Sequence, residues 1–151
     1  MKKLKLIVLL LSLAFASQAQ DCYSSVSLSI PNTSVDMFTN NVFPSVELGI
    51  VEKNVTLGLN VGRSNLNFDQ NQSYYGELKT TAFANLGFTK LYILLGIGSY
   101  TTKPNIFIEY GTGLIFGLNK KYDFTIGFSN WDGITYLSPG LVYNFKLWNQ
   151  Y

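Results

Sequence analysis

The sequence predicts an all-β protein, an eight-stranded antiparallel up-and-down transmembrane β-barrel preceded by a cleavable signal peptide. Three observations carry this prediction. Apolar and polar residues alternate with period two through eight segments of the chain, which is typical of strands with two different faces. Tight and longer connections alternate between those segments. Charged residues make up only 13% of the chain, about half of the share usual in soluble domains.

The first nineteen residues have the features of a secretory signal peptide. Lys2, Lys3 and Lys5 form a basic head, residues 6–16 are an apolar run, and residues 17–19 supply the small side chains that signal peptidase needs. The apolar run of eleven residues is too short to span a bilayer, which takes about 20 residues in a helix. We therefore expect a signal peptide at 1–19 and one outer-membrane barrel domain at 20–151.

Loss of the leader changes the charge balance. The full chain has 11 basic and 9 acidic residues, and removal of the three leader lysines leaves eight against nine, a net charge of −1. No basic patch remains that would indicate a nucleic-acid partner. The single cysteine, Cys22, cannot form an internal disulfide.

The eight predicted strands follow the apolar alternation in chain order. They are residues 23–30, 43–51, 55–64, 74–86, 90–100, 105–118, 122–130 and 134–148. The connections at 52–54, 87–89 and 119–121 are tight, whereas those at 31–42 and 65–73 are longer and polar. The connections at 101–104 and 131–133 are short but fall in phase with the longer ones. Because tight hairpins join antiparallel neighbours, this order predicts an up-and-down meander.

From the second strand onward, each predicted strand carries apolar side chains on one parity. These residues are, strand by strand, Val46, Leu48 and Ile50; Val55, Leu57, Leu59 and Val61; Leu78, Ala82, Ala84 and Leu86; Leu91, Ile93, Leu95 and Ile97; Ile106, Ile108, Tyr110, Leu114 and Phe116; Phe124, Ile126 and Phe128; and Leu141, Tyr143, Phe145 and Leu147. The opposite parity holds glycine, short polar residues and a few charges, for example Gly58, Asn60, Glu109 and Gly111.

This distribution favours a barrel whose apolar face meets lipid. A water-exposed face would carry dense Lys and Glu, whereas the polar face here is rich in glycine. In hydrocarbon every backbone polar group needs a partner within the protein, and a closed barrel satisfies that demand because it has no edge strands. Eight strands enclose an interior that side chains just fill. The alternative is a secreted soluble barrel, lipocalin-like, with the apolar parity inward.

The charges on the polar parity predict a network inside the barrel, since a lone buried charge is costly. Its members are Glu47, Glu77, Lys79 and Glu109. Arg63 has the parity of the apolar face and joins the network only if a β-bulge precedes it. The alternative is that some of these charges point to solvent at the two rims.

Aromatic residues collect at the ends of the predicted strands and indicate two interfacial girdles. The upper rim holds Tyr74, Tyr75, Tyr100 and Trp131, together with Phe43 and Tyr136; the lower rim holds Trp148 and Tyr151, together with Tyr92 and Tyr122. The alternative is that these rings are scattered core residues.

The architecture resembles the small eight-stranded outer-membrane barrels of the OmpA and OmpX type. The closing segment GLVYNFKLWNQY, with alternating Leu141, Tyr143, Phe145 and Leu147 and an aromatic end at Tyr151, looks like the terminal assembly signal of that family. The resemblance implies a bacterial outer-membrane location, tight turns that face the periplasm, and outer-membrane lipid as the partner. It also implies that loops 31–42 and 65–73 face outward, where an envelope or surface protein could bind.

The only catalytic chemistry that the sequence offers is acid–base work by paired carboxylates, Glu77 with Glu109 or Glu47, and the sequence favours a structural network for them. Histidine is absent from the whole chain, which removes Ser/His/Asp and Cys/His catalysis and the commonest zinc sites. We therefore expect no enzyme activity, no metal and no cofactor. The sequence favours a structural or interaction role with a polar, filled lumen, and the alternatives are a narrow small-solute channel or a soluble barrel that binds an apolar ligand.

Overall fold

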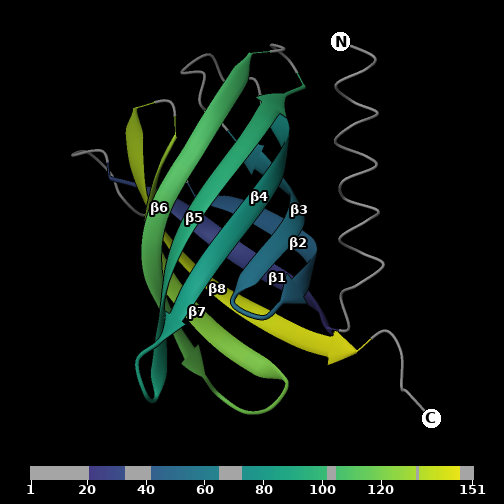
Figure 1. The fold of residues 1–151 in the computed structure, drawn as a ribbon. Coiled ribbons are helices and arrows are strands. Elements are labelled where there is room, and N and C mark those ends of the chain that lie inside the picture. Colours follow the sequence, from purple (N-terminus) through teal and green to yellow (C-terminus); the bar gives the residue numbers. More distant parts are fainter. Residues whose placement is uncertain (1–20, 33–41, 65–72, 102–104, 132, 147–151) are drawn as a thin grey trace.

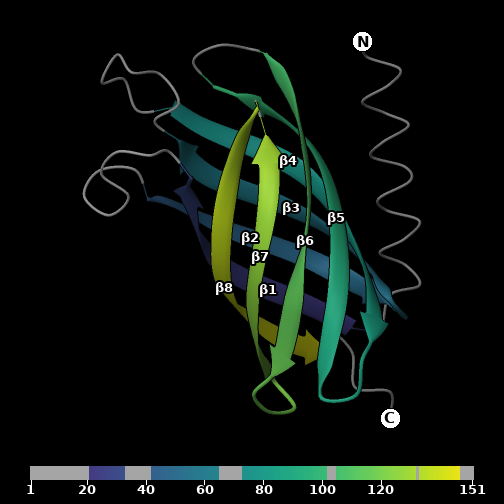
Figure 2. The same cartoon turned by 90° about the vertical axis from the view of Figure 1, so that its left-hand side faces the viewer.

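The computed structural model describes residues 21–32, 42–64, 73–101, 105–131 and 133–146. The strands are β1 (Asp21–Pro31), β2 (Phe43–Glu52), β3 (Val55–Ser64), β4 (Ser73–Asn85), β5 (Thr89–Tyr100), β6 (Ile106–Gly117), β7 (Tyr122–Trp131) and β8 (Ile134–Lys146). Each strand pairs with its neighbours in the chain, and β8 pairs with β1 to close the barrel (Figure 1 and Figure 2). The predicted eight-stranded antiparallel up-and-down fold is confirmed.

The strand ends agree with the sequence prediction to within a few residues. The largest difference within the described residues is at the start of β1, which begins at Asp21, two residues before the predicted start. β4 ends one residue early, before Gly87, which has a φ of 79° and lies in the turn to β5. β8 is described as far as Lys146, so the last predicted strand residues lie outside the described part of the chain. The predicted leader at 1–19 and loop residues 33–41 and 65–72 also lie outside it.

The two ends of the barrel differ in their connections. The β2–β3 turn is tight and places Lys53 at a φ of 54°. This turn and the β4–β5 and β6–β7 turns lie at one end, which we call the tight-turn end (Figure 1). The first and last described residues also meet there, since Asp21 pairs with Lys146. β1 and β3 end at the opposite end, which we call the loop end.

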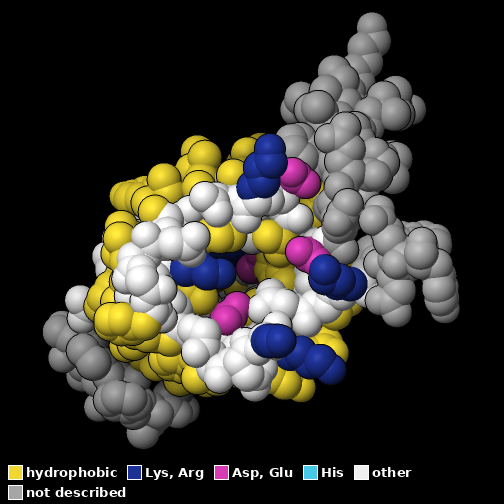
Figure 3. Space-filling view, turned by 60° about the horizontal axis from the view of Figure 1, so that its bottom comes forward, with side chains coloured by type: hydrophobic (Ala, Val, Ile, Leu, Met, Phe, Trp, Pro, Cys, Tyr) yellow, Lys and Arg dark blue, Asp and Glu magenta, His cyan; other side chains and the backbone are white. Residues whose placement is uncertain are grey.

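Large apolar side chains cover the outside of the barrel. Leu59, Ile93, Ile106 and Ile108 are 64%, 62%, 72% and 58% exposed. A view of the tight-turn end shows hydrophobic side chains around the rim and charged side chains in the hollow (Figure 3). The soluble alternative, which needs the apolar parity inward, is therefore wrong. In the described part of the chain no helix is long and apolar enough to cross a membrane, a finding that concerns helices alone.

The ladder that closes the barrel has a gap. Pairing between β1 and β8 stops at Ser27↔Gly140 and resumes at Ile30↔Leu137. Pro139 lies in this gap and pairs regularly with β7 on its other side. Because proline has no backbone N–H, it cannot donate to β1 at this position. The seam is therefore weakest near the loop end.

Candidate functional site

Aromatic side chains in the lumen lie across glycines of the neighbouring strands. Tyr23 of β1 pairs with Gly49 of β2, and Gly49 pairs with Gly58 of β3. A Cβ atom at either glycine would collide with the Tyr23 side chain. Tyr92 of β5 is paired with Gly113 of β6 in the same way, and its ring occupies the space that a Cβ there would need. Glycine therefore provides the room in which each ring lies flat along the wall.

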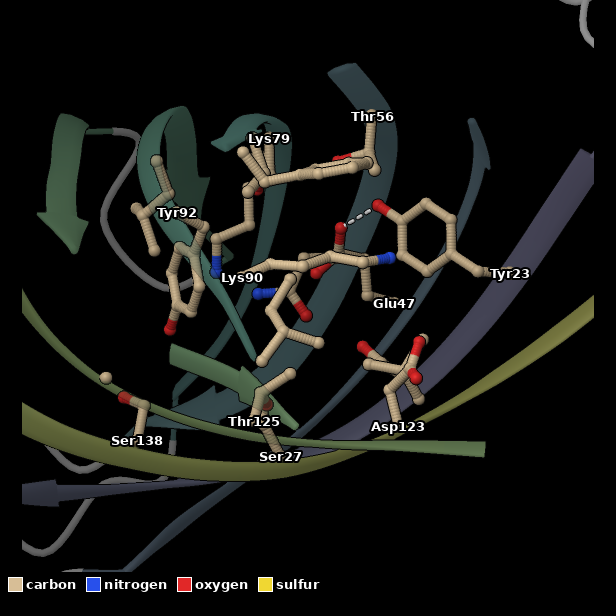
Figure 4. A pocket seen from close by; sticks show the side chains of 18 of the residues that line it. Tyr23, Ser27, Glu47, Thr56, Lys79, Lys90, Tyr92, Asp123, Thr125 and Ser138 are labelled. Carbon is tan, nitrogen blue, oxygen red and sulfur yellow. Dashed lines mark hydrogen bonds between the residues drawn. The ribbon is translucent and has the colours of Figure 1, made fainter. Parts of the chain in front are cut away.

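Charged and polar side chains connect the strands in the middle of the lumen. The Tyr23 hydroxyl donates a hydrogen bond to Glu47 Oε1 (Figure 4). Asn60 Nδ2 donates to Glu77 Oε2 at 3.1 Å. These contacts link β1 to β2 and β3 to β4, so they reinforce the backbone ladders from inside.

One ion pair crosses the same region. Lys79 Nζ lies 3.1 Å from Glu109 Oε2, and the two side chains are only 14% and 9% exposed. Lys79 and Glu109 both pair with Gly96 of β5, which lies between them. Since Gly96 has no side chain, the two charges reach each other across β5. The Glu77 carboxyl group also fills the space where a Cβ of Gly96 would lie.

The structure places four of the five residues of the predicted lumen network inside the barrel. Lys79 and Glu109 form the ion pair, while Glu47 and Glu77 bind neutral partners. Arg63 does not belong to the network. It pairs with Tyr74 in a regular ladder, directly after Gly62↔Tyr75, so no bulge turns its side chain inward.

The aromatic girdle predicted for the upper rim needs correction. Tyr75 and Trp131 are only 3% and 2% exposed and lie inside the barrel. They form an aromatic cluster with Phe43, Phe107 and Tyr136 near the loop end, and Tyr100 packs against it. Tyr74 is 54% exposed and points outward. Trp148 and Tyr151 lie outside the described residues.

The aromatic cluster closes the lumen at the loop end. The centroid of the Trp131 ring lies 4.9 Å from that of Tyr75, 5.3 Å from that of Phe107 and 4.8 Å from that of Tyr136. Phe107 and Tyr75 meet edge to face, with centroids 5.8 Å apart. Rings in contact at these distances attract one another and leave no room for water between them.

A cavity of about 560 Å³ occupies the lumen between this cluster and the tight turns. Glu47, Asn60 and Trp131 line its inner part. Lys53, Lys90 and Lys120 line its mouth, which opens at the tight-turn end (Figure 3). Side chains from several strands converge on this space in the close view (Figure 4). The cavity is thus a pocket with one mouth, lined by both polar and apolar side chains.

Tyr23 and Phe107 were not predicted from the sequence to lie in the lumen, and Asn60 was placed on the polar parity but not in the network, although all three build the lumen. All three obey the strand parity that places Glu47, Glu77 and Glu109 inside. That parity, applied to every side chain and not to the charges alone, would have found them. It would also have placed Tyr75 inside, since Tyr75 lies two positions before Glu77 on β4.

The arrangement can form hydrogen bonds and ion pairs with a guest molecule. Among the described residues, no three His, Cys, Asp or Glu side chains gather as a metal site would require. The chemistry available in the lumen is therefore recognition of polar and charged groups.

No protein-family model matches the sequence, and comparison with curated proteins gives no match either. Solved structures do match. A designed transmembrane β-barrel has a TM-score of 0.68 at 13% identity and covers 85% of this chain and 98% of its own. The N-terminal β-barrel domain of OprF from Pseudomonas aeruginosa has a TM-score of 0.66 at 11% identity and covers 84% and 98%.

The chain has the fold of a small transmembrane β-barrel. The outer membrane protein Ail of Yersinia pestis also has it, with a TM-score of 0.52 at 16% identity over 82% of this chain and 99% of its own. Identities this low show a shared fold and no more. The architecture of the barrel is therefore that of these small membrane barrels, and only its own residues indicate its role.

Proposed function

We propose that this chain is a non-enzymatic integral protein of the bacterial outer membrane with a structural or interaction role. In this proposal its lumen is closed to flow, and the connections at 31–42 and 65–73 present its binding surface to an envelope or surface protein. The tight-turn end faces the periplasm, as the resemblance to the OmpA and OmpX type implies.

The apolar outer surface is the observation that carries the membrane location. Side chains such as Leu48, Leu59, Ile93 and Ile108 are more than half exposed, and they belong to β2, β3, β5 and β6. In water such a continuous apolar surface would drive aggregation. In a bilayer the same side chains are favourable, and the closed ladder leaves no edge strand facing lipid.

The closed lumen supports a structural role over a channel. The aromatic cluster fills the loop end, and the Lys79–Glu109 ion pair crosses the middle of the barrel. The lumen is therefore closed at the loop end, although it is not filled, since a cavity of about 560 Å³ remains between the aromatic cluster and the tight turns. The absence of histidine from the whole sequence supports the expectation that the barrel has no hydrolase or acyltransferase activity.

Single-channel recording in planar bilayers tests the closed lumen. We expect the purified wild-type barrel to give no discrete conductance steps. Phe107→Ala/Trp131→Ala should give steps, because it removes two of the rings that close the loop end. Ile108→Ala on the outer face is the matched control and should stay silent. Conductance by the wild-type barrel would instead establish the narrow channel.

Partition of the exported chain tests the location. We expect the mature protein in detergent extracts of outer membranes, beginning after residue 19. Recovery in the aqueous fraction would contradict the proposal.

A further inference from the structure

The cavity of the lumen has the size and shape of a ligand site. Its volume of about 560 Å³ lies within the range of ~300–1,000 Å³ found for small-molecule pockets. The aromatic cluster closes one end, so a guest can enter only from the tight-turn end. A guest that enters meets Glu47, Asn60 and Trp131 at the inner part.

Two carboxylates, Glu47 and Glu109, line the inner part of the cavity with a single cation, Lys79. Lys79 forms its ion pair with Glu109. Glu47 lines the cavity and accepts a hydrogen bond from the neutral Tyr23 hydroxyl, and among the described residues no Lys or Arg lies within ion-pair distance of it. A carboxylate in a poorly solvated site without a cation is unfavourable.

A second acceptor lies beside Glu47. Asn60 pairs directly with Glu47 across the β2–β3 ladder and is only 3% exposed. Its Oδ1 atom has no hydrogen-bond partner among the described residues. The atom is covered in this structure, so the Asn60 side chain must rotate before a primary ammonium group, which carries three N–H donors, can bind both acceptors. The Trp131 Nε1 atom, which also has no partner in the described part of the chain, offers a donor further in.

The mouth of the cavity has the opposite charge. The two carboxylates there already have partners: Asp21 Oδ1 lies 3.8 Å from Lys146 Nζ, and Asp123 Oδ2 accepts a 2.7 Å hydrogen bond from Asn144 Nδ2. By contrast, the mouth lysines form no ion pair among the described residues; these are Lys53, Lys90 and Lys120. The mouth therefore favours an anionic group, while the inner part favours a cationic one.

The distance between the two charges fits a short extended chain. Glu47 and Lys53 are six positions apart along β2 and its turn. At a rise of ~3.3 Å per residue and a strand tilt of ~40°, six positions span roughly 15 Å along the barrel axis. Both side chains reach into the space between, so an extended peptide of about three residues can bridge them.

We propose that the lumen cavity binds a short peptide with free ends, which enters from the tight-turn end with its amino terminus first. Its ammonium group binds Glu47 and Asn60, and its carboxylate lies among the mouth lysines. The site goes beyond the structural role and does not depend on what the outer loops bind.

Calorimetric titration of the full barrel in dodecyl maltoside micelles tests this site, with trialanine as the probe. We expect trialanine to bind the wild-type barrel. N-acetyl-trialanine, which lacks the ammonium charge, and trialanine amide, which lacks the carboxylate, should each bind about tenfold more weakly, since a charged hydrogen bond is replaced by a neutral one. This comparison of probes needs no variant.

Glu47→Gln locates the ammonium site. Glutamine keeps the oxygen that accepts the Tyr23 hydrogen bond, so the barrel should still fold. We expect Glu47→Gln to weaken trialanine binding about tenfold and to leave N-acetyl-trialanine binding unchanged. Glu52→Gln, which removes the same charge at the rim of β2, is the matched control and should bind trialanine like the wild type.

Three results would overturn the site: no heat from trialanine with the wild-type barrel, no effect of blocking either end of the peptide, or equal weakening by Glu47→Gln and Glu52→Gln. None of these results bears on conductance or on membrane location. A conducting wild-type barrel would overturn the closed lumen, but it would leave the peptide titration to decide the site.

Discussion

At the scale of single residues, the pairing of rings with glycines explains why glycine is placed on the polar parity. Phe107 lies over Gly98, and Tyr75 lies over Gly62. Each ring belongs to the strand next to its glycine. The sequence indicates that these glycines face inward, but it cannot indicate which ring covers which glycine. That match depends on the register of neighbouring strands.

Gly49 is the residue at which this relation is tested most simply. A Cβ atom at Gly49 would lie 2.5 Å from the backbone oxygen of Leu57 and 2.5 Å from the Tyr23 ring. We expect Gly49→Ala to lower the free energy of unfolding by about 2 kcal/mol, the cost typical of overpacking. Urea unfolding of the refolded barrel in micelles measures this change.

Gly76→Ala is the control for that substitution. A Cβ at Gly76 would have no atom within 4 Å, so we expect little change in the unfolding midpoint. Equal destabilisation by both substitutions would show that backbone flexibility, and not the space for Tyr23, explains the glycines.

The Lys79–Glu109 ion pair gives a second prediction at this scale. Lys79→Met removes the cation and leaves Glu109 buried without a charged partner. We expect a loss of about 3 kcal/mol in the free energy of unfolding. Lys79→Met/Glu109→Gln should recover most of that loss, because position 109 then carries no buried charge without its cation. Denaturant unfolding of both variants measures the difference, and a double variant no more stable than the single one would contradict the interpretation.

At the scale of the strands, the alternation of apolar residues predicted the elements well, because each outward side chain faces lipid and each inward one faces the lumen. A closed barrel requires β1 to pair with β8, so that pairing could be predicted from the sequence. The gap that Pro139 leaves in the β1–β8 ladder could not be predicted. A proline disturbs a ladder only if its nitrogen points to a neighbouring strand. That direction follows from the register, which the sequence does not reveal.

The gap at Pro139 predicts that the seam can be strengthened. Pro139→Ala supplies an N–H to β1 in a region surrounded by lipid, where unpaired backbone groups are costly. We expect a net gain of about 1 kcal/mol in the free energy of unfolding. The new hydrogen bond in lipid should stabilise the barrel by more than the ~0.4–1 kcal/mol of chain entropy that proline saves.

Pro44→Ala is the comparison, since Pro44 lies at the start of β2, beyond the last β2–β3 pair at Ser45↔Gly62. Its new N–H should add little, and the variant should be no more stable than the wild type. Equal unfolding midpoints for Pro139→Ala and Pro44→Ala would show that the gap does not weaken the seam.

At the scale of the whole molecule, closure of the barrel brings together charges that are far apart in sequence. Glu47, Asn60 and Glu77 lie on three consecutive strands in one row of the ladder, whereas Glu109 reaches Lys79 across β5. The sequence predicted that these charges share the lumen. It could not separate the ion-paired carboxylate from the ones with neutral partners, because strand tilt and stagger decide which rows meet.

The outward direction of the apolar side chains is the central claim, and spin-label accessibility in liposomes tests it most directly. Single cysteines would replace Leu59, Ile93 and Ile108 on the outside, and Ser25 and Thr125 in the lumen, in a Cys22→Ser background. We expect labels at the three outer positions to be relaxed by oxygen dissolved in the lipid and not by a water-soluble nickel complex, with the opposite preference in the lumen. Nickel access at Leu59, Ile93 and Ile108 together with oxygen access at Ser25 and Thr125 would contradict a lipid-facing barrel.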